Sequence, residues 1–207
     1  MTGESNVHSM DEGQIALLVI DVQQGLFERA TPIYQAEPFL ENVNLLIRNA
    51  RRAGAPVFFV QHANKGTLTA GSQAWQLHPA IQPLAGETVI HKRHGDAFEE
   101  TELQDVLAVR GVKTLVVTGL VTHGCVKATC VGALERGYRV VLVADGHSSF
   151  SKQAAALIEK WNRKLSEMGV QLKETRQISS VAHRHRHSEP RPSSLPGPGG
   201  SSGQCTG

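Results

Sequence analysis

Short apolar runs alternate with longer amphipathic stretches along most of the chain. The apolar runs are rich in aliphatic and β-branched residues, which is typical of parallel strands covered on both faces. They predict strands at 15–20, 56–61, 87–91, 113–119, 138–144 and 170–175. Helical periodicity predicts helices at 38–52, 99–110, 125–136 and 152–168. Strands that alternate with helices indicate a Rossmann-like, three-layer α/β fold with a six-stranded, mainly parallel sheet.

The two ends of the chain lack this periodicity. Residues 1–12 are polar, and residues 182–207 are rich in Pro, Gly and Ser. We therefore expect a loose N-terminal segment, in which Met10 is an alternative start, one domain over 13–181, and a disordered tail. The connection at 62–86 is long for such a domain, and loops of that length are usually functional or mobile.

Composition narrows the classes of partner. The chain has 207 residues and a formal net charge of +2. The tail holds three arginines against one glutamate, so it carries the whole excess and the folded part is neutral. We therefore expect no nucleic-acid partner, which would require a strongly basic face. No apolar run approaches the ~20 residues of a membrane span, so we expect no membrane partner either.

The cysteines and the N-terminus suggest a compartment. Three cysteines in a chain of this length do not make a disulfide framework. The first residues lack the basic start and apolar stretch of a secretory signal. We therefore expect a reducing, cytoplasmic environment.

Three residues with different chemistry follow or end predicted strands. Asp21 follows the first strand, Lys92 ends the third, and Cys125 follows the fourth. Ligands of open parallel sheets bind beyond the carboxyl ends of the strands, so these side chains are expected to meet at one edge. Each also has an ordinary structural explanation, as a turn residue, a solvated lysine or a small core residue. Their coincidence at one edge favours catalysis.

The three side chains together would support nucleophilic catalysis. A helix N-terminus and a nearby cation lower the pKa of a thiol, which favours the reactive thiolate of Cys125. Asp21 would take the thiol proton and return it to a leaving group. Lys92 would orient Asp21 and favour the thiolate, and backbone N–H groups near Cys125 would hold an oxyanion.

A cysteine motif of the form G-x-x-T-x-x-C-V-x-x-T is the most specific pattern. It is formed by Gly119, Thr122, Cys125, Val126 and Thr129. Other matching segments are ALLVIDVQQGLF, WQLHP at 75–79, VIHKRHGDAF, and the continuation GALERGYRVVLVAD. With these segments, about residues 15–175 resemble the isochorismatase-like cysteine hydrolase family.

The resemblance implies an activity and a site. The family's Asp–Lys–Cys triad corresponds to Asp21, Lys92 and Cys125, and its reaction implies cleavage of a carbon–nitrogen bond in a small amide or lactam through a thioester. No cofactor is implied. A cis peptide at Val121–Thr122 is expected to help shape the oxyanion hole. Family members assemble as homo-oligomers in which a partner often closes the pocket, so a homo-oligomer is expected here.

Two departures from family patterns narrow the chemistry. Isochorismatases proper lack the nucleophilic cysteine, so the presence of Cys125 argues against that reaction. Nicotinamidases carry a metal-binding Asp-Trp-His signature where this chain reads VQHANKG, with His62 alone. A three-ligand metal site is therefore not expected, and His62 is interpreted as a polar residue at the pocket rim.

Several residues beside the motifs are candidates to line a pocket. Phe27, Trp75, Phe98 and His123 are predicted to bind substrate, although the aromatic residues are as often plain core residues. Cys130 is expected to be packed and to face away from Cys125, since it lies five positions further along a helix. Cys205 lies in the tail, where we expect it to be exposed and idle.

Both the substrate class and the class of function remain open at this point. Lactams, carbamoyl compounds and other amides are all compatible with the residues, and lactam opening like that of streptothricin hydrolase is one candidate from the resemblance. A different class of function is a non-catalytic binding or regulatory protein on the same scaffold. A third is an accessory metal or nucleic-acid role of the tail, which carries His183, His185 and His187.

Overall fold

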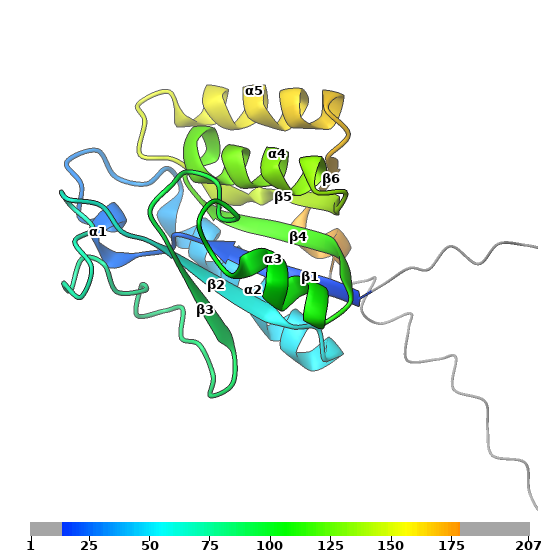
Figure 1. The fold of residues 1–207 in the computed structure, drawn as a ribbon. Helices are drawn as coiled ribbons and strands as arrows, with labels where there is room; N and C mark the ends of the chain where they lie inside the picture. Colours follow the sequence, from blue (N-terminus) through cyan, green and yellow to red (C-terminus); the bar gives the residue numbers. More distant parts are fainter. Residues whose placement is uncertain (1–13, 179–207) are drawn as a thin grey trace, which may run out of the picture.

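Parallel strands form the centre of the molecule, as Figure 1 shows. The computed structural model describes residues 14–178. Its strands are β1 (Gln14–Ile20), β2 (Val57–His62), β3 (Thr88–Lys92), β4 (Val112–Leu120), β5 (Arg139–Ser148) and β6 (Gln171–Lys173). They form one sheet in the order β3-β2-β1-β4-β5-β6, and every neighbouring pair runs parallel. The predicted six-stranded α/β fold is confirmed.

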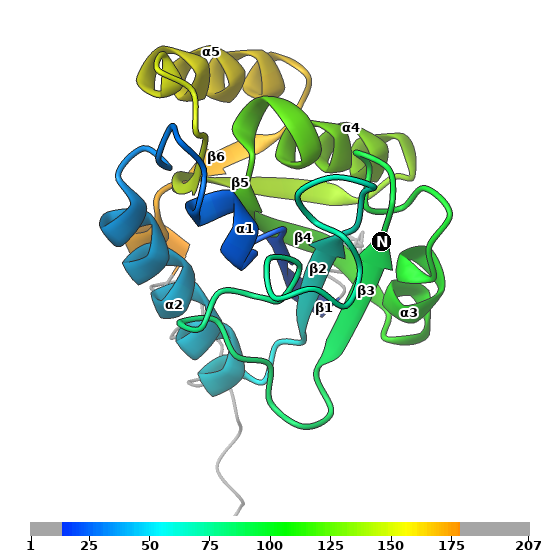
Figure 2. The same ribbon diagram turned by 90° about the vertical axis from the view of Figure 1, so that its left-hand side faces the viewer.

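Helices cover both faces of this sheet (Figure 2). They are α1 (Gln24–Phe27), α2 (Ala36–Ala53), α3 (Leu103–Val109), α4 (Lys127–Glu135) and α5 (Ala154–Glu167), with a π-helical turn η1 (Thr122–Val126) before α4. Alternate residues of β1 point to opposite faces, as the pleat requires. Leu17 and Val19 pack with α2, whereas Leu18 and Ile20 pack in the core that α3, α4 and α5 cover.

The boundaries differ from the prediction at several helices and at one strand. The helix expected at 99–110 is shorter, and the helix expected from residue 125 is preceded by η1. Strand β5 continues to Ser148, and the short helix α1 was not predicted. The predicted loose segment 1–12 and the tail 182–207, with Cys205 and its histidines, lie outside the described residues.

The long connection between β2 and β3 is hydrogen-bonded to the segment that directly follows β1, residues 22–25. Gln24 N donates to Gln76 O at 2.9 Å, Gly25 N to Ala74 O at 2.8 Å, and His78 N to Val22 O at 2.8 Å. A side chain on Gly25 would meet Ala74 at 2.8 Å, so this close approach requires glycine. The connection therefore lies beside α1 at the carboxyl ends of the strands (Figure 2).

None of the helices in this part of the chain is a candidate membrane span. Within residues 14–178, no helix combines the length and apolarity that crossing a bilayer requires.

Candidate active site

The topology brings the three predicted residues to one edge of the sheet. Asp21 follows β1, Lys92 is the last residue of β3, and Cys125 lies in η1 directly after β4. Strand β2 separates β1 from β3, and β4 is the other neighbour of β1. Asp21 adopts a left-handed conformation with φ of 50°. The chain therefore turns out of the sheet at Asp21, at the edge where the carboxyl ends of the neighbouring strands lie.

Lys92 is the centre of the charged cluster. Its ammonium lies 2.8 Å from Asp21 Oδ2, with both side chains buried. It also lies 3.3 Å from His62 Nδ1 and donates to the backbone oxygen of His94 at 3.0 Å. An ammonium has three donors and no acceptor, so Lys92 can only donate to these partners. The lysine is therefore held in one position beside the carboxylate.

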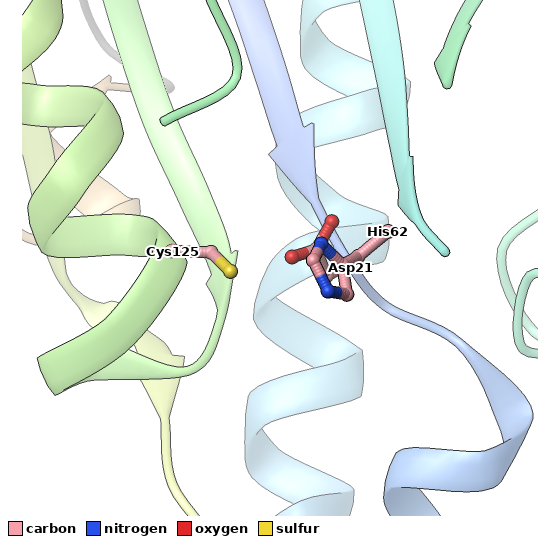
Figure 3. Close-up of side chains that lie close together, drawn as sticks. All are labelled: Asp21, His62 and Cys125. Atoms are coloured by element: carbon pink, nitrogen blue, oxygen red, sulfur yellow. The ribbon is translucent and has the colours of Figure 1, made fainter. Parts of the chain in front are cut away.

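Cys125 and His62 complete the cluster. One ligand-type atom from each of Asp21, His62 and Cys125 lies within 4.8 Å of the other two. Figure 3 shows the thiol reaching from the cysteine loop toward the carboxylate and the imidazole. The second carboxylate oxygen, Asp21 Oδ1, is buried and has no hydrogen-bond partner among residues 14–178. The predicted carboxylate, ammonium and thiol therefore do come together, and one carboxylate oxygen stays available to accept a proton.

Burial and charge act in opposite directions on these groups. Burial, and then the charge of Asp21, raise the pKa of the Cys125 thiol to about 12, although Lys92 opposes them. The expectation of a lowered thiol pKa is wrong, because the sequence shows the nearby cation and helix but not the desolvation. Burial alone would lower the pKa of Lys92, but the charges of Asp21 and Cys125 outweigh it and raise that pKa.

His62 is held as a neutral ring. Burial, followed by the charge of Lys92, lowers its pKa. Because the ammonium can only donate, His62 Nδ1 accepts from it, and the ring proton belongs on Nε2.

The same cluster has donor types that a metal ion could use. Asp21, His62 and Cys125 supply oxygen, nitrogen and sulfur within a short distance. The Lys92 ammonium, however, already contacts Asp21 and His62, and it would repel a cation placed among them. The donor set therefore does not fit a metal centre, and we derive no step through one.

The cysteine loop contains the cis peptide, but one residue earlier than expected. The cis bond joins Leu120 to Val121, so the predicted position at Val121–Thr122 is wrong. A non-proline residue carries no sequence signal for such a bond, which is why motif spacing misplaced it. Val121 O accepts from Gly124 N at 3.0 Å and from Val126 N at 3.3 Å, so the loop closes around this carbonyl.

Gly119 allows β4 to approach the end of β1 closely at Ile20. Its φ is 126°, and a Cβ at this position would collide with the backbone oxygen of Ile20. Only glycine fits there, which explains the first residue of the cysteine motif.

The predicted pocket residues lie in different surroundings. The Phe27 ring packs on His78 with centroids 4.5 Å apart, and Trp75 packs on His91 at 4.9 Å. His123 Nδ1 lies 3.4 Å from Ser149 Oγ.

Phe98 is placed in the core instead. It is 5% exposed and stacks on Tyr138 at 5.7 Å, so core packing accounts for its position.

Sequence reasoning missed a buried glutamine that positions the site. Gln23 Nε2 donates to the backbone oxygens of His62 at 3.0 Å and Trp75 at 2.7 Å. Its Oε1 accepts from His62 N at 2.9 Å. Gln23 therefore ties the end of β2 and the long connection to the segment after Asp21. The available signal was a polar residue two positions after a strand-ending aspartate.

Comparisons with known proteins agree on one family. The family model for the isochorismatase domain matches residues 15–177. The isochorismatase family protein YddQ of Bacillus subtilis is 36% identical over 143 residues, which span 67% of this chain and 79% of that protein. Streptothricin hydrolase of Streptomyces noursei is 37% identical over 142 residues, which span 68% of this chain but only 56% of the hydrolase.

Solved structures add the same fold. The crystal structure of an isochorismatase family protein aligns with a TM-score of 0.73 and 30% identity, covering 77% of this chain and 98% of that one.

Proposed function

The chain belongs to the isochorismatase-like cysteine hydrolase family, and from this premise we propose that it hydrolyses a carbon–nitrogen bond of a small amide or lactam. Asp21, Lys92 and Cys125 would form its catalytic triad, with a thioester intermediate. One observation supports this most directly. A buried carboxylate is paired with Lys92 through one oxygen, has no partner for its other oxygen among residues 14–178, and lies within 4.8 Å of the Cys125 thiol. A merely structural ion pair gains nothing from an unsatisfied acceptor at that place.

Acylation begins from a protonated thiol, because the pKa of Cys125 is raised. As the sulfur attacks the substrate carbonyl, Asp21 accepts the thiol proton. Backbone N–H groups of the cysteine loop, at Val121, Thr122 or Cys125, stabilise the oxyanion. The carbon–nitrogen bond then breaks, and the proton on Asp21 passes to the departing nitrogen. The products of this step are an acyl thioester and an amine or ammonia, and for a lactam the amine stays attached to the acyl chain.

Deacylation uses the same carboxylate. Water attacks the thioester carbonyl while Asp21 takes a proton from it. The carbon–sulfur bond breaks, the acid leaves, and the proton returns to the Cys125 sulfur. Lys92 keeps its charge beside both anionic groups throughout, since Asp21, His62 and His94 hold its ammonium in place. The net reaction consumes one water for each amide bond, and it requires no cofactor.

The substrate is proposed to be small. Phe27, Trp75 and His123 are candidates to line its pocket, and the indole nitrogen of Trp75 is buried without a partner among residues 14–178. The name of the Streptomyces noursei relative makes a streptothricin-like lactam one candidate. A panel of nicotinamide, an N-carbamoyl amino acid and a cyclic lactam separates the main substrate classes.

A covalent-adduct experiment tests the proposal. Each panel compound is incubated with the protein, and stalled adducts are located by peptide mass spectrometry. We expect the acyl group on Cys125 and an unmodified Cys130, which is fully buried and serves as an internal control. Turnover that survives in Cys125→Ala would overturn the mechanism.

The rival is a binding or regulatory protein that keeps the scaffold without chemistry. Thiol titration separates the two: an unreactive Cys125 with an ordinary pKa of ~8.5 favours the rival. We also propose a cytoplasmic homo-oligomer whose partner helps close the pocket. A monomer by light scattering would contradict the oligomer.

A further inference from the structure

A buried histidine contacts Thr122, the first residue of η1. His147, near the end of β5, is 3% exposed. Its Nδ1 lies 2.9 Å from Thr122 Oγ1, and Thr122 is itself 1% exposed. We infer that His147 is a positioning residue, which holds the Cys125 loop against Asp21 through the hydroxyl group of Thr122. The inference rests on the proposed cysteine hydrolase function, since it concerns the placement of the nucleophile.

The hydrogen bonds around His147 have one consistent direction. Asn162 of α5 donates through Nδ2 to the backbone oxygen of Ala144 at 3.4 Å, so its Oδ1 faces His147 Nε2 at 2.8 Å. Nε2 therefore carries the ring proton, and Nδ1 accepts from the Thr122 hydroxyl. Burial lowers the pKa of His147 to about 4, which keeps the ring neutral and the direction of these bonds unchanged at neutral pH.

This chain of bonds connects α5 to the nucleophile. Thr122 Oγ1 also lies 3.0 Å from the backbone oxygen of Ser148, so its single hydrogen has two acceptors on consecutive residues of β5. The following residue, Ser149, contacts His123 within the loop at 3.4 Å. Cys125 comes three residues after Thr122, in a turn that closes on Val121 O. A displacement of Thr122 would therefore move the sulfur relative to Asp21.

A positioning role and a packing role make different predictions about the two ring nitrogens of His147. Asparagine at position 147 can place an acceptor where Nδ1 lies and loses the contact with Asn162. Glutamine can reach Asn162 and loses the contact with Thr122. Each variant breaks one buried hydrogen bond, so a packing role predicts equal effects of the two. A positioning role through Thr122 predicts that asparagine rescues and glutamine does not.

The test is the pH profile of Cys125 alkylation by iodoacetamide, read by mass spectrometry with Cys130 as the internal control. In His147→Gln and His147→Leu we expect the midpoint to fall toward that of an ordinary thiol. The reason is that the Cys125 sulfur would move away from its buried surroundings and from the Asp21 carboxylate, which together raise its pKa. His147→Asn should keep the wild-type midpoint. Asp21, Lys92 and His62, the charged and titratable groups around the sulfur, are unchanged in all three variants.

Turnover gives a second readout on any panel compound that is hydrolysed. We expect a fall in kcat of about tenfold or more in His147→Gln with KM within about twofold, because small misplacements of a reacting group are costly. Thr122→Val should reproduce this loss, and adding His147→Gln to it should cause little further change, since the two act in series. Thr122→Ser keeps the hydroxyl and should stay near wild type.

Several results would overturn the inference. Equal midpoints in His147→Asn and His147→Gln would assign His147 to packing, as would additive effects with Thr122→Val. If the His147 variants fail to fold, Thr122→Val replaces them in the test. A wild-type midpoint of Cys125 alkylation in Thr122→Val would then overturn the inference. Alkylation needs no substrate, so this readout is independent of whether Cys125→Ala abolishes turnover. Failure of the hydrolase proposal and failure of the positioning role are thus distinguishable.

Discussion

Cys125 and Cys130 occupy one helical stretch but two different regions of the molecule. Burial raises the pKa of both thiols to about 12. At Cys130, burial is the whole cause, and the thiol is fully enclosed in the core. At Cys125, the thiol is partly exposed, the Asp21 carboxylate adds to the shift and the Lys92 ammonium opposes it.

The comparison teaches that a raised thiol pKa has two different meanings. In the core region it marks an inert packed residue. At the sheet edge it accompanies a neighbouring carboxylate that can take the proton when a substrate arrives. The distinguishing feature is therefore the unpartnered oxygen of Asp21, and the pKa alone does not separate the two cysteines.

The largest expected difference between the two regions is in turnover. Cys125→Ala should lower kcat/KM by at least about 1,000-fold, because loss of a nucleophile removes the covalent route. Cys130→Ala should keep most activity and instead lower stability, since it creates a cavity in the core. Steady-state kinetics and denaturant unfolding on both variants check this. Comparable activity losses in the two would remove the distinction.

Removing the ammonium should damage the edge region next most strongly. Lys92→Met leaves the Asp21 charge buried and unpaired, which costs about 3–5 kcal/mol of unfolding free energy. The matched control is the Arg51–Glu87 pair, which is held at a similar distance, 2.7 Å, but is partly exposed. Arg51→Met should cost about 1 kcal/mol or less. Urea titrations measure both, and similar costs would contradict the buried character assigned to the Lys92 pair.

Alkaline pH should weaken the core through Cys130. Its folded pKa is raised, so its contribution to stability is present below the unfolded pKa, near 9.0, and is lost as pH rises toward about 12. The limiting slope is about 1.4 kcal/mol per pH unit for one group. Unfolding free energies between pH 8 and pH 11 should therefore fall less steeply in Cys130→Ala than in the wild type. Parallel curves would show that Cys130 does not hold its proton in the folded state.

The smallest expected difference concerns two phenylalanines. Phe27→Leu should change KM by a few-fold with little loss of stability, since we propose that Phe27, whose ring packs on His78, lines the substrate pocket. Phe98→Leu should lower stability by about 1 kcal/mol and leave KM unchanged, because Phe98 is buried against Tyr138. A change of KM in the Phe98 variant would return that residue to the pocket.

Local pattern predicted most of the fold correctly. The apolar pattern marked the six strands of the sheet within a few residues, and most of them are continuous apolar runs because buried parallel strands show the same composition on both faces. Gly54 and Gly137 follow α2 and α4 with φ of 72° and 80°, where a helix needs a left-handed cap. The short helix α1 and the turn η1 escaped prediction, since four or five residues are too few to show periodicity.

Only part of the candidate site could be predicted from the sequence. The ends of three strands indicated Asp21, Lys92 and Cys125, since parallel topology gathers such positions at one edge. Nothing local indicated that Gln23 would hold the long connection, or that His147 would contact Thr122 from 25 residues away. Such contacts depend on side-chain packing between elements that are remote in the chain.

The order of residues by itself determined the α/β architecture, the edge at which chemistry would collect, and the types of group found there. Only the tertiary structure decided the state of those groups. Desolvation, the distance between charges and the saturation of donors depend on what surrounds each atom in space. That is why the chain alone suggested an acidic thiol at Cys125, while its folded surroundings hold the proton on the sulfur and leave one oxygen of Asp21 to receive it.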